Sequence, residues 1–367
     1  MSATTLAGVE GELRRLWSEA AASAREHGEP LLRASVVNLV VVTDGPGAVG
    51  EVTEALAELT ESVPGRMIVV VPEPLAPDGL DAWPSIRCRP LGGRGQREGT
   101  YQVCGEQVVV HARGAVVGEL PALVRPLLET DVRSVLWWRA PLPAERSVLD
   151  RLAEEVQTVV VDTARGAVWA DGVTPGGDPI AAVAGLLARR RGTKGRRWTV
   201  RDLAFARLTP WRELTAALFD IVPCRDRLAR LDSVAVAGRP GAAEVRLYVG
   251  WLASRLGWTA TGPGSPLART YERPGGGRLT VRIAPVEEGT ALARAAFEGP
   301  GVHAWVQLGE TTPAGEQLEA AAVIEGAEPV SQVVAVAPMT DARLVGGELT
   351  MTGDDRVYEA AVQAVIR

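Results

Sequence analysis

The chain has 367 residues, of which 46% are hydrophobic and 23% charged, so its length and composition indicate a globular protein of about two domains. The net charge of −6 at pH 7 argues against a general nucleic-acid binder. Among the 39 basic residues Lys194 is the only lysine, and Gly195 follows it. The chain therefore has no P-loop lysine, and no other lysine that could form a Schiff base.

The first half of the sequence alternates between helix and strand patterns. Apolar residues recur every three or four positions in 4–27 and predict an amphipathic helix within an N-terminal segment, 1–33. Alternating strands and helices predict an α/β domain over 34–175, with a mostly parallel sheet and flanking helices. The β-branched and apolar runs that predict its buried strands are 35–43, 66–71, 133–138 and 158–162.

Two stretches of this half are less regular. Residues 72–98 contain many prolines and glycines, and we expect them to be irregular apart from one strand near 86–89. Gly105–Glu106 separates two short strand-like runs, 101–104 and 107–111, which is typical of a hairpin.

The second half begins with a predicted helix and basic linker over 176–200. Residues 201–367 are expected to form an α+β domain with an antiparallel sheet, because helical patterns at 202–231 and 241–256 precede several strands without intervening helices. A last helix is predicted at 354–366. The predicted strands are 268–272, 278–283, 291–297, 302–308, 318–324 and 330–336.

A glycine-rich motif follows the first β-branched strand. Gly45, Gly47 and Gly50 match G-x-G-x-x-G between a strand and a helix, the context of a dinucleotide-binding loop. The acid that should follow is Glu73, 23 residues after Gly50. The alternative is an ordinary helix start, with Asp44 or Gly45 as the N-cap and Pro46 as the first helical residue.

Cysteine and histidine usage limits metal and redox chemistry. Three of each, widely spaced, predict no metal site, and an odd cysteine count is typical of a reducing cytoplasm. Cys88 lies between two arginines, which favour the thiolate and make it a redox candidate, although an inert strand cysteine is the alternative. Acidic residues precede any apolar run, and no stretch is long enough to span a bilayer, so neither a signal peptide nor a membrane span is predicted.

Trp137 and Trp138 end a predicted strand, so their rings should lie on opposite faces of the sheet. One ring can pack in the core and the other can lie at an interface, where tryptophan is enriched, but both can equally be core residues. Asp162 ends another strand, a position that suits a site residue in an α/β sheet.

The most distinctive segment is 202–220, with the sequence DLAFARLTPWRELTAALFD. Thr209 can cap a helix that has Pro210 in its first position, and Trp211, Leu214 and Leu218 then form an apolar stripe. The charged and polar groups at the helix start can form surface ion pairs or contact a partner or a phosphate. These groups are Arg207, Thr209, Arg212 and Glu213.

A second basic feature is the run that includes Arg189, Arg190, Arg191, Lys194, Arg196 and Arg197. It reads as a solvated linker, or as an anchor for an acidic surface or a phosphate.

The 202–220 segment resembles the D-L-x-W/F-x-R-L-T-P-W-R-x-L signature of the OpcA family, the glucose-6-phosphate dehydrogenase assembly or effector proteins of cyanobacteria and actinobacteria. Four shorter stretches are similar to that family and come in the same order, from about residue 34 to the C-terminus. They are VNLVVVTD (37–44), CGEQVVV (104–110), RSVLWW (133–138) and DDRVYEA (354–360).

The resemblance implies a cytoplasmic, non-catalytic protein without a cofactor. It would bind glucose-6-phosphate dehydrogenase and promote its active oligomer or its substrate affinity in the oxidative pentose phosphate pathway. The candidate contacts are Arg207, Thr209, Trp211, Arg212 and Glu213, with Trp137 or Trp138 as a second patch. Cyanobacterial members are linked to thioredoxin through cysteines near the C-terminus. No cysteine follows Cys224 here, so that route is not expected.

Two other functions remain open from the residues. One is a nucleotide-binding enzyme that uses the Gly45–Gly50 loop. The other is a sugar-phosphate sensor that uses the arginines of 189–197.

Overall fold

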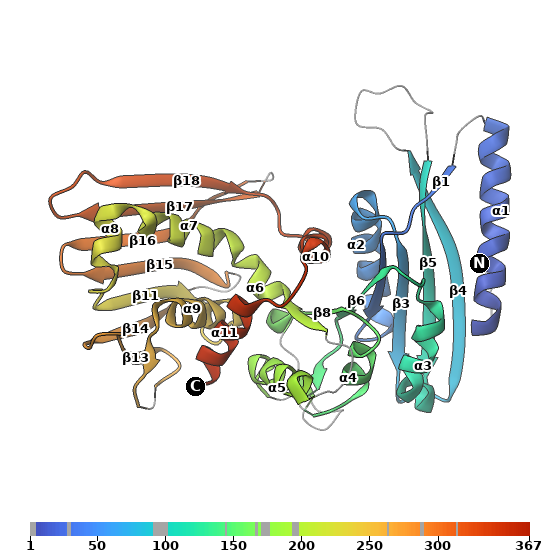
Figure 1. Ribbon diagram of the computed structural model, residues 1–367, viewed down its shortest axis with the longest axis horizontal. Helices are drawn as coiled ribbons and strands as arrows, with labels where there is room; N and C mark the ends of the chain where they lie inside the picture. Colours follow the sequence, from blue (N-terminus) through green and yellow to red (C-terminus); the bar gives the residue numbers. More distant parts are fainter. Residues whose placement is uncertain are drawn as a thin grey trace.

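The computed structural model describes residues 5–27, 31–90, 102–143, 145–165, 168–169, 177–192, 198–262, 264–286, 290–312 and 315–367. Two eight-stranded sheets form the two halves of the molecule, with helices between them (Figure 1). This arrangement confirms the predicted α/β half followed by an α+β half.

The first half is a doubly wound α/β unit. Its central strands run parallel in the order β5-β3-β2-β6-β8-β10, which reverses direction between β2 and β6. In such sheets ligands bind outside the carboxyl ends of the strands at the reversal. The eight strands are β1 (Leu31–Arg33), β2 (Val37–Val42), β3 (Arg66–Glu73), β4 (Gly79–Pro90), β5 (Gln102–Arg113), β6 (Arg133–Trp138), β8 (Thr158–Val161) and β10 (Thr199–Asp202).

Helices cover both faces of this sheet. The described helices of this half are α1 (Val9–His27), α2 (Val49–Ser62), α3 (Leu120–Val124), α4 (Val148–Ala153) and α5 (Pro179–Gly192), and the short strands β7 (Leu142–Pro143) and β9 (Val168–Trp169) pair with each other. The face that carries α2 is completed by α10 (Asp341–Thr350), which comes from the far end of the chain. Val345 and Leu349 of α10 belong to the same buried cluster as Trp137 and Val160 of the sheet. The C-terminal part of the chain therefore helps to build the core of the first half.

Two predictions from the sequence are wrong in the region of strands β4 and β5. Residues 102–113 form one continuous strand and not a hairpin, because Gly105 brings two backbones together: a Cβ there would lie 2.8 Å from the carbonyl oxygen of Gly65. Residues 79–90 form a long strand and not an irregular segment. Pro84 is tolerated because β4 lies at the sheet edge, where an N–H is not needed on both sides.

The same strand pair contains a disulfide. Cys88 and Cys104 are directly opposed in the β4–β5 register, and their sulfur atoms are bonded. Cys88 is thus not the free thiolate that its arginine neighbours favoured. Its partner could not be predicted, because the register of the two strands is not evident from the sequence.

We expect the disulfide to stabilise the fold by about 3 kcal/mol, since it closes a loop of 16 residues. The double substitution Cys88→Ser and Cys104→Ser should lower the free energy of unfolding in urea by this amount under non-reducing conditions. With dithiothreitol present, wild type and variant should unfold at nearly the same urea concentration. A difference that persists after complete reduction would contradict this prediction.

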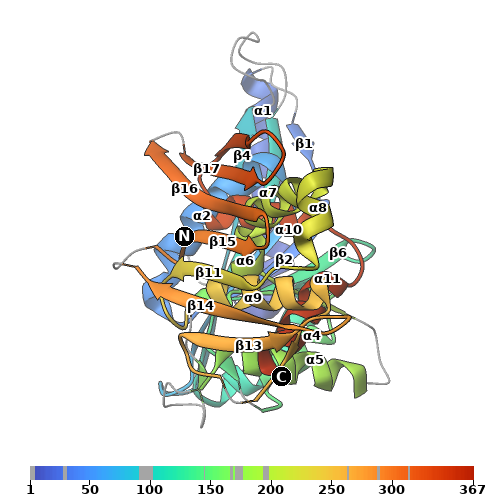
Figure 2. The ribbon, with the colours of Figure 1, turned by 90° about the vertical axis from the view of Figure 1, so that its left-hand side faces the viewer.

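The second half is built on a mixed, mostly antiparallel sheet with the order β12-β13-β14-β11-β15-β16-β17-β18. Every neighbouring pair is antiparallel except β11 and β14. Figure 2 shows these strands in front of the first half of the molecule. They are β11 (Ser233–Gly238), β12 (Thr259–Ala260), β13 (Ala268–Glu272), β14 (Arg278–Pro285), β15 (Leu292–Gly299), β16 (Val302–Thr312), β17 (Gly315–Ile324) and β18 (Val330–Val336).

Helices α6 (Leu203–Arg207), α7 (Thr209–Asp220), α8 (Val222–Leu228), α9 (Ala243–Leu256) and α11 (Arg356–Ile366) accompany this sheet. The C-terminal helix α11 packs against both α9 and α5, so it joins the two halves (Figure 1). Gly250 permits the close contact with α9, because a Cβ there would lie 2.5 Å from the carbonyl oxygen of Ala361. Among the described residues, none of the helices combines the length and the apolar character that a membrane span requires.

Candidate functional site

The distinctive 202–220 segment lies where the two halves meet. Asp202 ends β10 and caps α6, with its Oδ1 accepting from the Ala204 N–H at 3.0 Å. Helix α7 follows almost without a break, and its predicted apolar stripe of Trp211, Leu214 and Leu218 is buried, as expected. The predicted cap at Thr209 is wrong: the chain is already helical at Leu208, so the Thr209 side chain caps nothing.

Arg207 links this segment to the first sheet. Its Nη1 and Nη2 donate to the two carboxylate oxygens of Asp162 at 2.9 and 2.7 Å. Asp162 directly follows β8, and only 2% of its side chain is exposed. The expectation that Asp162 is a site position at a strand end therefore coincides with a contact from the distinctive segment.

Further charged side chains lie beside the Arg207–Asp162 pair, at the carboxyl ends of the parallel strands. Arg139, which follows β6 and has a side chain that is 1% exposed, donates to Glu51 of α2 at 2.7 Å. Arg165 donates to the same Glu51 oxygen at 2.9 Å and to Asp341 of α10 at 2.6 Å. We call these side chains the junction cluster, which consists of Glu51, Arg139, Asp162, Arg165, Arg207 and Asp341.

Thr209, Arg212 and Glu213 lie in the first turns of α7. Arg212 lies over the Phe205 ring, with 3.8 Å from its guanidinium carbon to the ring centre, and its Nη2 donates to the Thr209 hydroxyl at 2.9 Å. Burial lowers the pKa of Arg212. Glu213 is exposed, whereas Thr209 and Arg212 are half-buried.

A buried carboxyl and a buried phenol connect this segment to α11. Tyr358 donates its hydroxyl proton to Asp202 Oδ2 at 2.8 Å, and the Thr163 hydroxyl donates to the same oxygen at 2.7 Å. Burial, and then the nearby charge of Asp162, raise the pKa of Asp202 to about 7. Tyr358 lies in the DDRVYEA stretch that resembles the family, but nothing in the sequence indicated its contact with Asp202, which is 156 residues away.

The raised pKa of Asp202 predicts a pH dependence of stability. Below the ordinary carboxyl value of 3.8 both the folded and the unfolded chain hold the proton. As the pH rises toward 7 only the folded chain keeps it, so Asp202 contributes stability at low pH that is lost as the pH passes through 7. We expect wild type to lose about 2–3 kcal/mol relative to Asp202→Asn between pH 5 and pH 8. Urea unfolding of both proteins at these two pH values measures the difference, and parallel pH profiles would show that the group does not titrate there.

The Gly45–Gly50 motif lies at the reversal of the strand order, after β2. Gly45 is the N-cap with φ of 138°, Pro46 begins a 3₁₀ turn, and α2 follows, as the helix-start interpretation predicted. Glu73 ends β3, the position at which the dinucleotide-binding motif requires an acid. Its Oε2, however, lies 2.8 Å from Nε2 of His111 on β5. Glu51 lies in the first turn of α2 and already binds two guanidinium groups, so the positive charge at this edge is neutralised by protein carboxylates.

Trp137 and Trp138 lie on opposite faces of the sheet, in different buried clusters, as strand alternation predicts. Their exposed fractions are 1% and 9%, so the structure favours the core interpretation for both rings. Arg139 lies over the Trp137 ring at 4.9 Å, which places this tryptophan directly beneath the junction cluster.

Two arginines of the basic run, Arg189 and Arg190, are paired within the chain. Arg189 donates to Asp150 at 2.7 Å, and Arg190 donates to Glu359 of α11 at 2.7 Å. Lys194, Arg196 and Arg197 lie outside the described residues. Within the described part of the chain, no group of three or more histidine, cysteine or carboxylate side chains is arranged to hold a metal.

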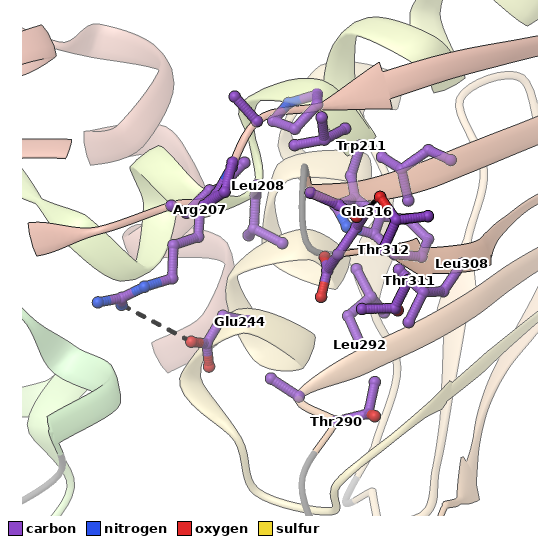
Figure 3. A pocket seen from close by; sticks show the side chains of 18 residues that line it. Arg207, Leu208, Trp211, Glu244, Thr290, Leu292, Leu308, Thr311, Thr312 and Glu316 are labelled. Carbon is purple, nitrogen blue, oxygen red and sulfur yellow. Dashed lines mark hydrogen bonds and ion pairs between the residues drawn. The ribbon is translucent and has the colours of Figure 1, made fainter. Parts of the chain in front are cut away.

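A cleft of about 560 Å³ opens beside the junction cluster, between the α6–α7 connection and the ends of strands β15 to β18 (Figure 3). Arg207 and Trp211, both predicted as site residues, line it together with Glu244 of α9. Sequence reasoning missed Glu244, which lies in an otherwise ordinary helical pattern.

The order of the first sheet and the mixed second sheet define a class of two-part proteins with a Rossmann-type first half. A lysine-to-alanine mutant of KijD10, a 3-ketoreductase from Actinomadura kijaniata, has a similar fold, with a TM-score of 0.50, 14% identity, and coverage of 90% of this chain and 95% of that one. At this identity the similarity concerns the fold alone.

Family models identify the chain more closely. Residues 56–184 match the glucose-6-phosphate dehydrogenase subunit N-terminal domain of OpcA, and residues 199–362 match the corresponding C-terminal domain. The chain therefore belongs to the OpcA family.

Two cyanobacterial relatives are each named as an OxPP cycle protein OpcA. The one from Synechocystis sp. is 25% identical over 218 residues, which are 58% of this chain and 40% of that protein. The one from Synechococcus elongatus is 29% identical over 157 residues, which are 42% of this chain and 32% of that protein. The matched part of the chain thus spans two fifths or less of the length of these relatives.

Proposed function

We propose that the protein is a non-catalytic partner of glucose-6-phosphate dehydrogenase in the oxidative branch of the pentose phosphate pathway. It binds the dehydrogenase and favours its active oligomer or its affinity for glucose 6-phosphate. The observation that carries this proposal is the match of both halves to subunit domains of the dehydrogenase, with the most specific segment at their junction. To activate, the protein must bind the active state of the dehydrogenase more tightly than the inactive one.

The geometry divides the predicted contact residues into two groups. Arg207 is held by its two hydrogen bonds to Asp162, and Trp211, Trp137 and Trp138 are buried. Glu213 is exposed next to the half-buried Thr209 and Arg212, and we propose that these three contact the dehydrogenase. Arginine is frequent among the residues that dominate binding energy, and Arg212 is held in place by Phe205.

A pair of charge-reversal variants tests these contacts. Glu213→Arg on α7 should weaken binding of the dehydrogenase at least about tenfold. Glu26→Arg on α1, which is equally exposed at the other end of the molecule, changes the net charge identically and should have no effect. Biolayer interferometry with immobilised dehydrogenase measures both. Equal binding by the two folded variants would remove this surface from the interface.

One observation favours a second candidate function. The Gly45–Gly50 loop lies at the strand reversal, the position at which doubly wound sheets bind nucleotides. A thermal-shift screen with NAD, NADP and ATP tests this function, because a ligand that binds only the folded state raises the melting temperature. A rise with a nucleotide would support an enzyme, and a rise with glucose 6-phosphate alone would support a sugar-phosphate sensor.

A further inference from the structure

The second sheet ends in an edge strand that lacks the usual protection. An edge strand presents free N–H and C=O groups, which natural proteins shield by short length, charged side chains or proline. The outermost strand of the second half is β18, and within the described residues β17 is the one strand that pairs with it (Figure 1). Its seven residues, VSQVVAV, include neither a charged residue nor a proline.

The other edges that described strands form in the two large sheets are protected. At the opposite edge of the same sheet, β12 has only two residues. In the first sheet, β10 has four residues, of which Arg201 and Asp202 are charged, and β1 has three residues, of which Arg33 is charged. Strand β4 contains Pro84 and Arg87 and packs against α1. β18 is therefore the edge at which a further strand can add with the least obstruction.

The side chains of β18 leave the strand open. Ser331, Gln332 and Val333 are exposed in succession, and Val333, on the outer face of the sheet, is 60% exposed. On the inner face, Val330 and Val334 pack against the core. An uncharged strand that is rich in β-branched residues and open along its length is well suited to pair with another strand.

A second copy of the chain matches this edge. In an antiparallel pairing centred on Val333, each residue of β18 would lie opposite a residue of the same face of the sheet. The opposed pairs are Val333 with Val333, Gln332 with Val334, Ser331 with Ala335, and Val330 with Val336. No two charges of the same sign oppose one another in this register. A two-fold axis at Val333 produces the same contact from both chains, as a closed dimer requires.

We propose that the protein forms a dimer in which β18 pairs antiparallel with β18 of a second copy, with Val333 at the two-fold axis. The eight-stranded sheets of the two second halves would then form one continuous sheet, in which β18 has a hydrogen-bonded neighbour on both sides. The valines of the inner face would continue the apolar core across the contact. This inference does not rest on the proposed function, because the dimer contains no dehydrogenase.

Charges placed at the two-fold axis test this dimer. Sedimentation equilibrium of the full chain should show a dimer, and Val333→Lys and Val333→Glu should each weaken it at least about tenfold, because two like charges would lie directly opposite each other. An equimolar mixture of the two variants should recover association, since opposite charges then face each other. Val323→Lys is the matched control. Val323 is 50% exposed on the same face but belongs to β17, so this variant should dimerise as wild type does.

Cross-linking gives a second measurement that does not depend on added charge. Cys224 is buried, and Cys88 and Cys104 are bonded to each other, so Val333→Cys introduces an accessible thiol into a chain that otherwise has none. A short bismaleimide should link Val333→Cys into a covalent dimer and leave Val323→Cys unlinked.

A wild type that is monomeric at every concentration measured, or a mixture of the two charge variants that does not associate, would overturn the proposal. Equal dissociation of Val323→Lys would place the contact on the open face of the sheet and would also overturn it. A monomeric wild type whose binding to the dehydrogenase is lost in Val333→Lys would assign the edge to the dehydrogenase and not to a second copy.

Discussion

Replacing Arg207 by leucine is expected to lower the free energy of unfolding by about 3–5 kcal/mol. Arg207 is the bidentate partner of Asp162, whose side chain is 2% exposed. Removal of the guanidinium leaves a buried carboxylate without its main counter-charge, and that carboxylate lies close to the second buried acid, Asp202. The loss should be measured by urea unfolding at pH 7.

A double substitution distinguishes the stability that is lost through the unpaired charge of Asp162 from the stability that is lost through packing. Asp162→Asn combined with Arg207→Leu removes both charges, so it should recover much of the stability that Arg207→Leu loses. If the double variant is no more stable than Arg207→Leu alone, the stabilising role of the pair is contradicted. Arg343 is a suitable control, because its ion pair with Glu58 is exposed and weak, so Arg343→Leu should cost less than about 1 kcal/mol.

Trp137→Ala is expected to cost about 3–5 kcal/mol, the usual range for removing a large aromatic side chain from a core. The ring is 1% exposed, packs in the cluster that α10 completes, and lies beneath Arg139. We therefore expect the loss to loosen the contact of α10 with the first sheet as well as the sheet itself.

The matched control for this prediction is Trp305→Ala. Trp305 is half-buried on the sheet of the second half, and its alanine variant should lose clearly less stability than Trp137→Ala. Hydrogen exchange should in addition show faster exchange in α10 only for Trp137→Ala. Equal losses in both variants would mean that Trp137 is not a core anchor.

Strands with a clear local pattern could be predicted from the sequence. The predicted ranges 268–272 and 330–336 agree with β13 and β18. Helix α10 was missed because two glycines interrupt its pattern, and its stability comes from packing on α2 and the sheet. The false hairpin at Gly105 arose because glycine permits both a turn and a close backbone approach, and only the neighbouring strand decides between them.

The candidate site was only partly predictable. The 202–220 segment could be recognised in the sequence by its specific motif, and Asp162 by its position at the end of a predicted strand. Arg139, Arg165 and Asp341 carried no such signal, because the junction cluster pairs residues that are far apart in the chain, such as Arg139 with Asp341.

The position of the most specific segment gives it two roles. It connects the two halves through Arg207 and Asp202, and it exposes Glu213 beside the half-buried Thr209 and Arg212. A partner that binds this surface therefore contacts a rigid support and not a free loop, which reduces the entropy cost of association.

The most direct test of the proposed function is the rate of the cognate glucose-6-phosphate dehydrogenase as a function of glucose 6-phosphate concentration, with and without equimolar purified protein. We expect the protein to lower KM or raise kcat, and Glu213→Arg to weaken this effect. Identical saturation curves with and without the protein, at concentrations at which it remains folded, would contradict the proposed function.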